Sequence, residues 1–149
     1  MGMPRQAFFP VEEAESVALA ATSEAVPLAR RLVIDVARQW RLPRGFADDA
    51  ELVMSELTTN AIKATHLFYA THGLAETGNI RIRLRWTTPS LFTEIWDVNP
   101  MLPTPRKASE DDVGGRGLGI VEFICARWAA ERCEDGGKLV WAELRLPRT

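Results

Sequence analysis

The sequence predicts an α+β fold, a two-layer α/β sandwich in which a mixed, mostly antiparallel sheet carries its helices on one face. Segments with strand-like alternation and segments with a helical period follow one another in the order β-α-α-β-β-loop-α-β-β. That order is neither a strict βαβ alternation nor an all-β pattern. The length of 149 residues fits one domain of ordinary size. A composition of 46% apolar and 26% charged residues is typical of a globular chain.

The composition also excludes several classes of protein. The chain has 18 Lys and Arg against 20 Asp and Glu, so no excess positive charge favours direct binding of nucleic acid. Cys125 and Cys133 have no His or Cys neighbours at zinc spacing, and we expect both to be reduced thiols. No apolar run approaches the roughly 20 residues that cross a bilayer, and the first residues do not resemble a signal peptide. These features favour a cytoplasmic protein without membrane contact.

In the first half of the chain we expect a flexible leader over residues 1–14, and the folded domain over 15–149. A short strand is predicted at 16–22, and a helix begins near Pro27 and stops at 42–45. A second helix begins near Ala47 with an acidic opening at Asp48 and Asp49. The predicted buried side of the first helix is Leu28, Ala29, Leu32, Val33, Val36, Ala37 and Trp40. The predicted buried side of the second is Ala50, Val53, Leu57, Ala61 and Ala64.

In the second half, apolar residues alternate with arginines over 80–86, so one face of this strand should be buried and the other wet. The wet face would carry Arg81, Arg83 and Arg85. A turn at 87–90 leads to a strand over 91–97, and residues 100–115 form a long loop without a period. A helix over about 117–128 and a hairpin with strands at 129–134 and 138–146 complete the chain.

Three groups of residues are candidates for chemistry. The first is Glu56-Leu-Thr-Thr-Asn60, because four residues along a helix bring a carboxylate and a neutral oxygen donor to one side. That pair suits a hard cation such as Mg²⁺, with the carboxylate left to polarise a hydroxyl or water. An exposed polar helical turn is the alternative explanation.

The second group is Gly114-Gly-Arg-Gly-Leu-Gly119, at the start of a helix. Glycines at a helix N-terminus let backbone N–H groups approach an anion closely, although a simple hinge gives the same pattern. It is neither a Rossmann fingerprint nor a Walker A motif, since no strand precedes it and no Gly-Lys-Ser/Thr closes it. The third candidate is Asp97 at a strand tip, which either accepts a hydrogen bond from a ligand amino group or begins a turn.

Taken in this order, the three groups resemble the motifs of the gyrase/histidine-kinase/MutL-type ATPase superfamily. Ser55-Glu-Leu-Thr-Thr-Asn-Ala61 is similar to its N box, Ile95-Trp-Asp97 to the start of its first glycine box, and Gly115-Arg-Gly-Leu-Gly-Ile-Val121 to its second. The closing segment 136–144 and Ala29-Arg-Arg-Leu32 look like the small single-domain actinobacterial branch, which is related to anti-sigma-factor serine/threonine kinases. The resemblance spans about residues 15–146.

This resemblance implies a Bergerat-type sandwich that holds ATP and Mg²⁺ between its helices and a lid over residues 100–116. It makes Glu56 the general base, Asn60 the Mg²⁺ ligand and Asp97 the acceptor of the adenine amino group. The other cofactor-binding residues that it implies are Lys63, Asn99, Gly115, Arg116, Gly117, Leu118 and Gly119. Family kinases phosphorylate a serine of a small anti-anti-sigma protein and bind a sigma factor in competition with it, commonly as dimers.

The sequence departs from the family at the first glycine box, where Asp-x-Gly-x-Gly reads Asp97-Val-Asn-Pro-Met101. Asn99 can still adopt a left-handed turn there at modest cost. The leading hypothesis is an anti-sigma regulatory protein that binds ATP and Mg²⁺ and phosphorylates a Ser or Thr of an antagonist. The alternative is a non-catalytic module that sequesters a sigma factor or the antagonist, which Asn99 and Met101 favour. A nucleotide-binding domain unrelated to transcription is a third possibility.

Overall fold

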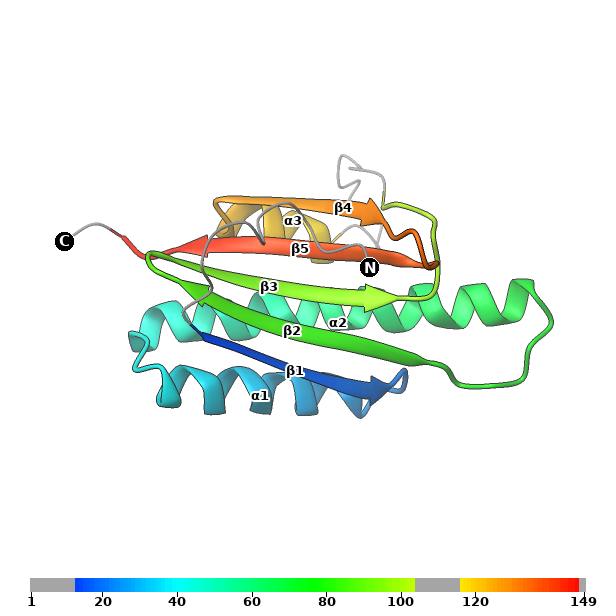
Figure 1. Ribbon diagram of the computed structural model, residues 1–149, viewed down its shortest axis with the longest axis horizontal. Helices are drawn as coiled ribbons and strands as arrows, with labels where there is room; N and C mark the ends of the chain where they lie inside the picture. The colour runs from blue at the N-terminus through cyan, green and yellow to red at the C-terminus, as the bar shows by residue number, and fades with distance from the viewer. Residues whose placement is uncertain (1–12, 104–115, 148–149) are drawn as a thin grey trace.

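The structure is a computed structural model that describes residues 13–103 and 116–147, except the side chains at 116–118. In chain order the elements are β1 (Glu13–Ala20), α1 (Ala25–Gln39), α2 (Arg44–Thr71), β2 (Asn79–Thr87), β3 (Ser90–Asp97), α3 (Arg116–Ile124), β4 (Arg127–Arg132) and β5 (Lys138–Arg145). The strands form one sheet in the order β1-β2-β3-β5-β4, antiparallel at every pair (Figure 1). The predicted fold class and element order are confirmed. Residues 1–12 of the expected leader and 104–115 of the expected loop lie outside the described residues.

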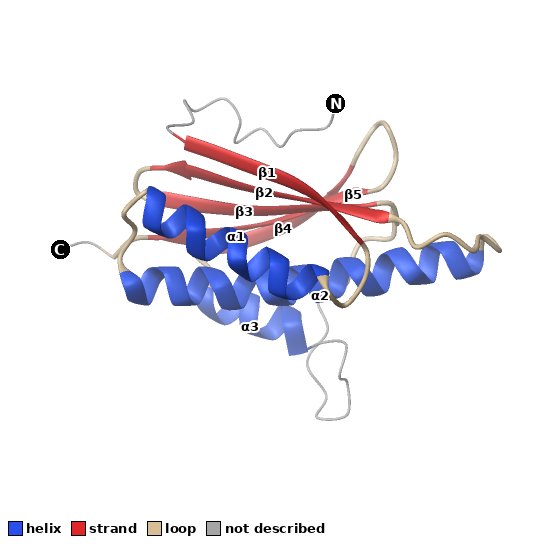
Figure 2. Cartoon of the chain, turned by 90° about the horizontal axis from the view of Figure 1, so that it is seen from below, coloured by secondary structure: helices blue, strands red, loops and turns tan. Residues whose placement is uncertain are grey.

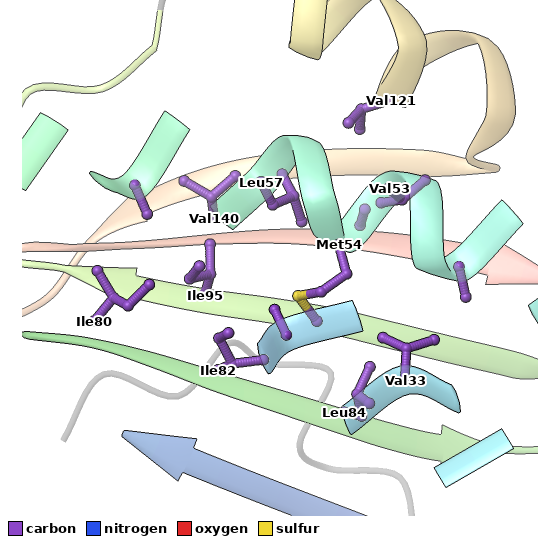
Figure 3. Packing of buried hydrophobic residues seen from close by; sticks show 14 of the residues in the cluster. Val33, Val53, Met54, Leu57, Ile80, Ile82, Leu84, Ile95, Val121 and Val140 are labelled. Atoms are coloured by element: carbon purple, nitrogen blue, oxygen red, sulfur yellow. The ribbon is translucent and has the colours of Figure 1, made fainter. Parts of the chain in front are cut away.

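All three helices lie on one face of the sheet, as Figure 2 shows. The long helix α2 lies between α1 and α3 and packs on β3. Figure 3 shows Met54 and Leu57 of α2 reaching toward apolar side chains that include Ile95 of β3. All three are almost completely buried, and burying each apolar side chain contributes about 2 kcal/mol. This core fixes α2, and the polar residues along its edge, in place against the sheet.

The helix α1 has the predicted period but a narrower buried side. The residues that it buries completely are Ala25, Ala29, Val33, Val36 and Ala37. Leu28, which was predicted to be buried, is 52% exposed. The buried stripe is centred on Ala29 and Val33, and neighbouring residues of a helix point about 100° apart, so Leu28 faces away from the core.

The helix α2 begins three residues earlier than predicted. Pro43 is its N-cap, with φ −59°, and the first helical residue is Arg44 instead of Ala47. Asp48 and Asp49 therefore lie beyond the first turn of α2. The helix dipole acts most strongly within that first turn. At the other end α2 stops at Thr71.

The last helix is shorter than predicted and the strand after it begins earlier. α3 ends at Ile124, and Trp128, predicted to end this helix, lies in β4 opposite Ala142 of β5. The Ala126 N–H donates to the Glu143 carbonyl, which starts the pairing of the two strands. Pairing with β5 overrides the helical pattern of the local sequence.

The sheet face opposite the helices is less exposed to solvent than the sequence predicts. Arg85 was predicted to face solvent, yet only 1% of its side chain is exposed. Its Nε donates to Glu94 Oε2 at 2.6 Å, and its guanidinium group lies 4.6 Å from the centre of the Phe92 ring. A second apolar cluster, formed by Phe92, Leu139 and Trp141, lies on the same face. The alternation of apolar and charged residues thus predicts the side of the strand but not its burial.

The described part of the chain contains no helix that is both long enough and apolar enough to cross a membrane.

Candidate functional site

The helix α2 carries Glu56 and Asn60 at the margin of its buried stripe, where the helical wheel places them. The next residues, Leu57 and Ala61, are buried in the core. Glu56 and Asn60 are half-buried, and their spacing puts them on neighbouring turns of the same side. Within the described residues, neither side chain makes a hydrogen bond or an ion pair.

Asp97 ends β3 and is the centre of a buried polar network. Lys138, the first residue of β5, lies directly opposite Asp97 across the two strands. The Lys138 Nζ donates to Asp97 Oδ1 and to the Asn99 carbonyl, both at 2.9 Å, and the Asn99 N–H donates to the same Oδ1 at 2.9 Å. The side chains of Asp97 and Lys138 are 1% and 6% exposed. The predicted strand-tip position of Asp97 is confirmed, and both of these donors converge on one oxygen atom of its carboxylate.

Asn99 lies in the turn that follows β3 (residues 97–101, the Asp97 turn) and connects this turn to α2. Its Nδ2 donates to the Ala64 carbonyl at 3.0 Å, and its Oδ1 accepts from the Met101 N–H at 2.9 Å. Asn99 does not adopt the left-handed conformation that its residue type allows, because Arg41 is the one non-glycine residue in the described chain with a positive φ. Hydrogen bonds of the Asp97 and Asn99 side chains to the backbone shape the turn instead.

The charge of Asp97 depends on Lys138. Burial raises the pKa of the Asp97 carboxyl above its ordinary value, and the charge and hydrogen bond of Lys138 lower it. A buried carboxylate without such a partner would take up a proton and become a donor as well as an acceptor. Lys138 therefore favours the ionised form, which only accepts hydrogen bonds.

The hairpin between β4 and β5 brings Lys138 to this position through a close backbone approach at Gly137. Gly137 has φ +76°, and a Cβ atom there would lie 2.2 Å from the Asp97 carbonyl oxygen. Gly136 has φ +105°, but a Cβ atom there would meet nothing within 4 Å. Of these two hairpin glycines, Gly137 is therefore the one at which a side chain would meet both backbone strain and a steric clash.

We predict that Gly137→Ala lowers the free energy of unfolding by more than Gly136→Ala does, in urea unfolding experiments. Each substitution places alanine at positive φ, which costs about 1–3 kcal/mol. Gly137→Ala also pushes β5 away from Asp97. Equal losses in the two variants would contradict a packing role for Gly137.

The glycine-rich candidate segment lies at the start of α3, which packs beside α2. Gly115 is outside the described residues, and Arg116, Gly117 and Leu118 are placed by backbone only, in the first turn of the helix. A Cβ atom at Gly119 would meet no atom within 4 Å, so the protein's own packing does not require glycine there. Lys63 is exposed on α2.

The distances along α2 suit an elongated ligand with a metal ion. Glu56, Asn60 and Ala64 follow one another at intervals of one turn, so Glu56 lies about 12 Å along the helix from the residue that binds Asn99. Within the described residues no group of three or more His, Cys, Asp or Glu is placed to hold a metal ion. Magnesium bound beside phosphates usually takes most of its oxygen ligands from the phosphates and from water, so a single amide oxygen such as that of Asn60 suits this kind of site. The side-chain oxygen atoms of Glu56, Asn60 and Asp97 are of the chemical type that suits a nucleotide with Mg²⁺.

The sequence did not point to Lys138 or to the backbone carbonyl of Ala64 as members of this site. Lys138 follows two glycines and begins an apolar strand, which is an ordinary surface pattern. Its pairing with Asp97 depends on the register of β3 against β5, and those strands are far apart in the sequence.

Comparisons with known proteins identify the family and the fold. Residues 19–144 match the family described as a histidine kinase-like ATPase domain. No curated protein gives a significant match.

Two solved structures share the fold. The crystal structure of the RsbU and RsbW domains of Rv1364c from Mycobacterium tuberculosis superposes with a TM-score of 0.63 at 18% identity, covering 92% of this chain and 33% of that one. This chain thus spans about a third of that protein chain. The SiaB–SiaC complex from Pseudomonas aeruginosa gives a TM-score of 0.62 at 10% identity, covering 90% of this chain and 89% of the matched chain.

Proposed function

Because this chain belongs to the histidine kinase-like ATPase domain family, we propose that it binds ATP with Mg²⁺ and phosphorylates a Ser or Thr of a small antagonist protein. The observation that carries the proposal is the alignment of three polar groups along α2. Glu56 and Asn60 occupy successive turns, and Asn99 anchors the Asp97 turn to Ala64 one turn further on.

Each of Asp97, Asn60 and Glu56 has one role in this proposal. The buried Asp97 carboxylate would accept a hydrogen bond from the adenine amino group, and the amide oxygen of Asn60 would help to hold Mg²⁺, which supplies charge neutralisation to the phosphates. Glu56, one turn before Asn60, accepts the proton of the attacking hydroxyl. The hydroxyl oxygen forms a bond to the γ-phosphorus while the bond between this phosphorus and the ADP oxygen breaks. Positioning and charge neutralisation supply most of the catalysis in phosphoryl transfer.

Two of the structures with the same fold are a chain with RsbU and RsbW domains and a SiaB–SiaC complex. We propose that this chain likewise acts by switching partners: it holds a sigma factor and phosphorylates an anti-anti-sigma antagonist, as a homodimer in the cytoplasm. The identities below 20% support the fold alone, so these partners rest on the proposed kinase site.

A second candidate function is a non-catalytic binding module with the same fold. The observation that favours it is the altered glycine box: both polar ends of the Asn99 amide are used inside the protein. Met101, which replaces the second glycine, is 66% exposed and offers an apolar contact to a partner protein. Such a module would sequester its partner without turning over ATP.

The experiment that separates the two functions is a calorimetric titration of ATP with and without Mg²⁺. The kinase proposal predicts saturable binding that is tighter by about tenfold or more with Mg²⁺, because the metal ion links the phosphates to Asn60. Asn60→Ala should remove most of this Mg²⁺ dependence and leave the fold unchanged.

The matched control is Asn79→Ala, which removes an exposed asparagine at the start of β2. It should bind ATP and Mg²⁺ like the natural chain. Absence of saturable ATP binding in the natural chain would leave only the non-catalytic module.

A further inference from the structure

The hydrogen bonds around Asp97 are asymmetric, and this asymmetry bears on which base the site accepts. The ammonium group of Lys138 and the backbone N–H of Asn99 both donate to Oδ1, each at 2.9 Å. With two donors on Oδ1, the second oxygen, Oδ2, is the acceptor left for a ligand.

We propose that Lys138 is the positioning residue that sets the base specificity of this site, because it engages one oxygen of Asp97 and leaves the other, an acceptor, to face the base. This inference rests on the proposed nucleotide site. An ionised carboxylate oxygen accepts a hydrogen bond from the 6-amino group of adenine. It repels the carbonyl oxygen of a 6-oxopurine, which has no donor at that position.

Three features show that Lys138 holds this position firmly. Its side chain is 6% exposed, it lies directly opposite Asp97 in the strand register, and it also donates to the Asn99 carbonyl. Lys138 therefore binds the carboxylate and the turn that follows it. Asn99 is anchored in turn to α2, so the orientation of Asp97 is coupled to the helix that carries Glu56 and Asn60.

The fixed orientation makes an unusual prediction for Asp97→Asn. Two donors at the Oδ1 position require an acceptor, so the amide oxygen takes that place and the amide NH₂ replaces Oδ2. The NH₂ group donates to a 6-oxo group and meets the adenine amino group donor to donor. We therefore expect a reversed preference, from ATP to inosine triphosphate, in this variant.

The test measures the affinities of ATP and inosine triphosphate, each with Mg²⁺, by calorimetry on the full chain. The natural chain should prefer ATP by about tenfold or more, since sites reject analogues that leave buried polar groups unpaired. Asp97→Asn should prefer inosine triphosphate. In Asp97→Asn with Lys138→Met, the preference for inosine triphosphate should fall by about threefold or more, because the Asn99 N–H is then the one remaining donor of the two that orient the amide. This double variant buries no unpaired charge, so it avoids the stability loss expected of Lys138→Met alone.

The control is Arg132→Met, because the exposed Arg132 side chain donates to the Pro100 carbonyl of the same turn without contacting Asp97. Its ATP preference should equal that of the natural chain. A double variant with the same reversed preference as Asp97→Asn would overturn the role of Lys138 while leaving the nucleotide site intact. An Asp97→Asn variant that still prefers ATP would likewise overturn the role of Lys138. If the natural chain bound neither nucleotide, the proposed function itself would fail, and the inference with it.

Discussion

Replacing Glu56 by Gln should lower the rate of phosphoryl transfer to an antagonist protein by about 10²–10⁴-fold, the usual contribution of a general base. The affinity for ATP and Mg²⁺ should change by less than about threefold, because Glu56 lies a full turn from Asn60 and two turns from the residue that anchors the Asp97 turn. Single-turnover transfer of labelled γ-phosphate measures the rate, and calorimetry measures the affinity. The change keeps the size of the side chain and removes its basicity together with its negative charge.

The matched control is Glu51→Gln, the same change on the same helix at a residue off the Glu56–Asn60–Ala64 line. It should leave both the rate and the affinity unchanged. Equal losses of transfer and of ATP affinity in Glu56→Gln would contradict the assignment of Glu56 as the base and make it a binding residue.

Replacing Glu94 by Ala should lower the free energy of unfolding by about 3–5 kcal/mol, as measured by urea unfolding. Glu94 and Arg85 are each 1% exposed, and the substitution leaves the guanidinium group buried without its carboxylate. Burial raises the pKa of Glu94 above its ordinary value even with Arg85 beside it, so the surroundings are poor in water. An uncompensated charge in such a place is costly.

The combined change Arg85→Met with Glu94→Leu is the control, because it removes both charges and keeps similar volumes. Buried ion pairs replaced in this way often leave stability unchanged or raise it. We expect the double variant to be within about 1 kcal/mol of the natural chain. A double variant as unstable as Glu94→Ala would show that the carboxylate matters for more than the charge of Arg85.

The sequence predicted most of the fold because its patterns are local. The alternation over β2 and the order of the elements depend on neighbouring residues, and both are confirmed. The errors arise where a non-local contact decides. Arg85 is buried because Glu94 lies on the paired strand, and Trp128 lies in a strand because β5 pairs with it. Leu28 is exposed because the packing of α1 selected a stripe of smaller residues.

The candidate site was predictable to the extent that its residues share one element. Glu56 and Asn60 are close because a helix places them so, and Asp97 is recognisable at the end of its strand. The partners of Asp97 were not predictable. Lys138 reaches it through a strand register, and Asn99 fixes the turn through a carbonyl on α2 that has no signature in the sequence.

The central claim is that one nucleotide lies along α2, from the Asp97 turn to Glu56, with its metal ion at Asn60. A crystal structure of the chain with a non-hydrolysable ATP analogue and Mg²⁺ tests it most directly. We predict an adenine amino group within hydrogen-bond distance of Asp97 Oδ2, and a magnesium ion bound to the Asn60 side chain and to phosphate oxygens. A nucleotide bound elsewhere, or with its base turned away from Asp97, would contradict the account.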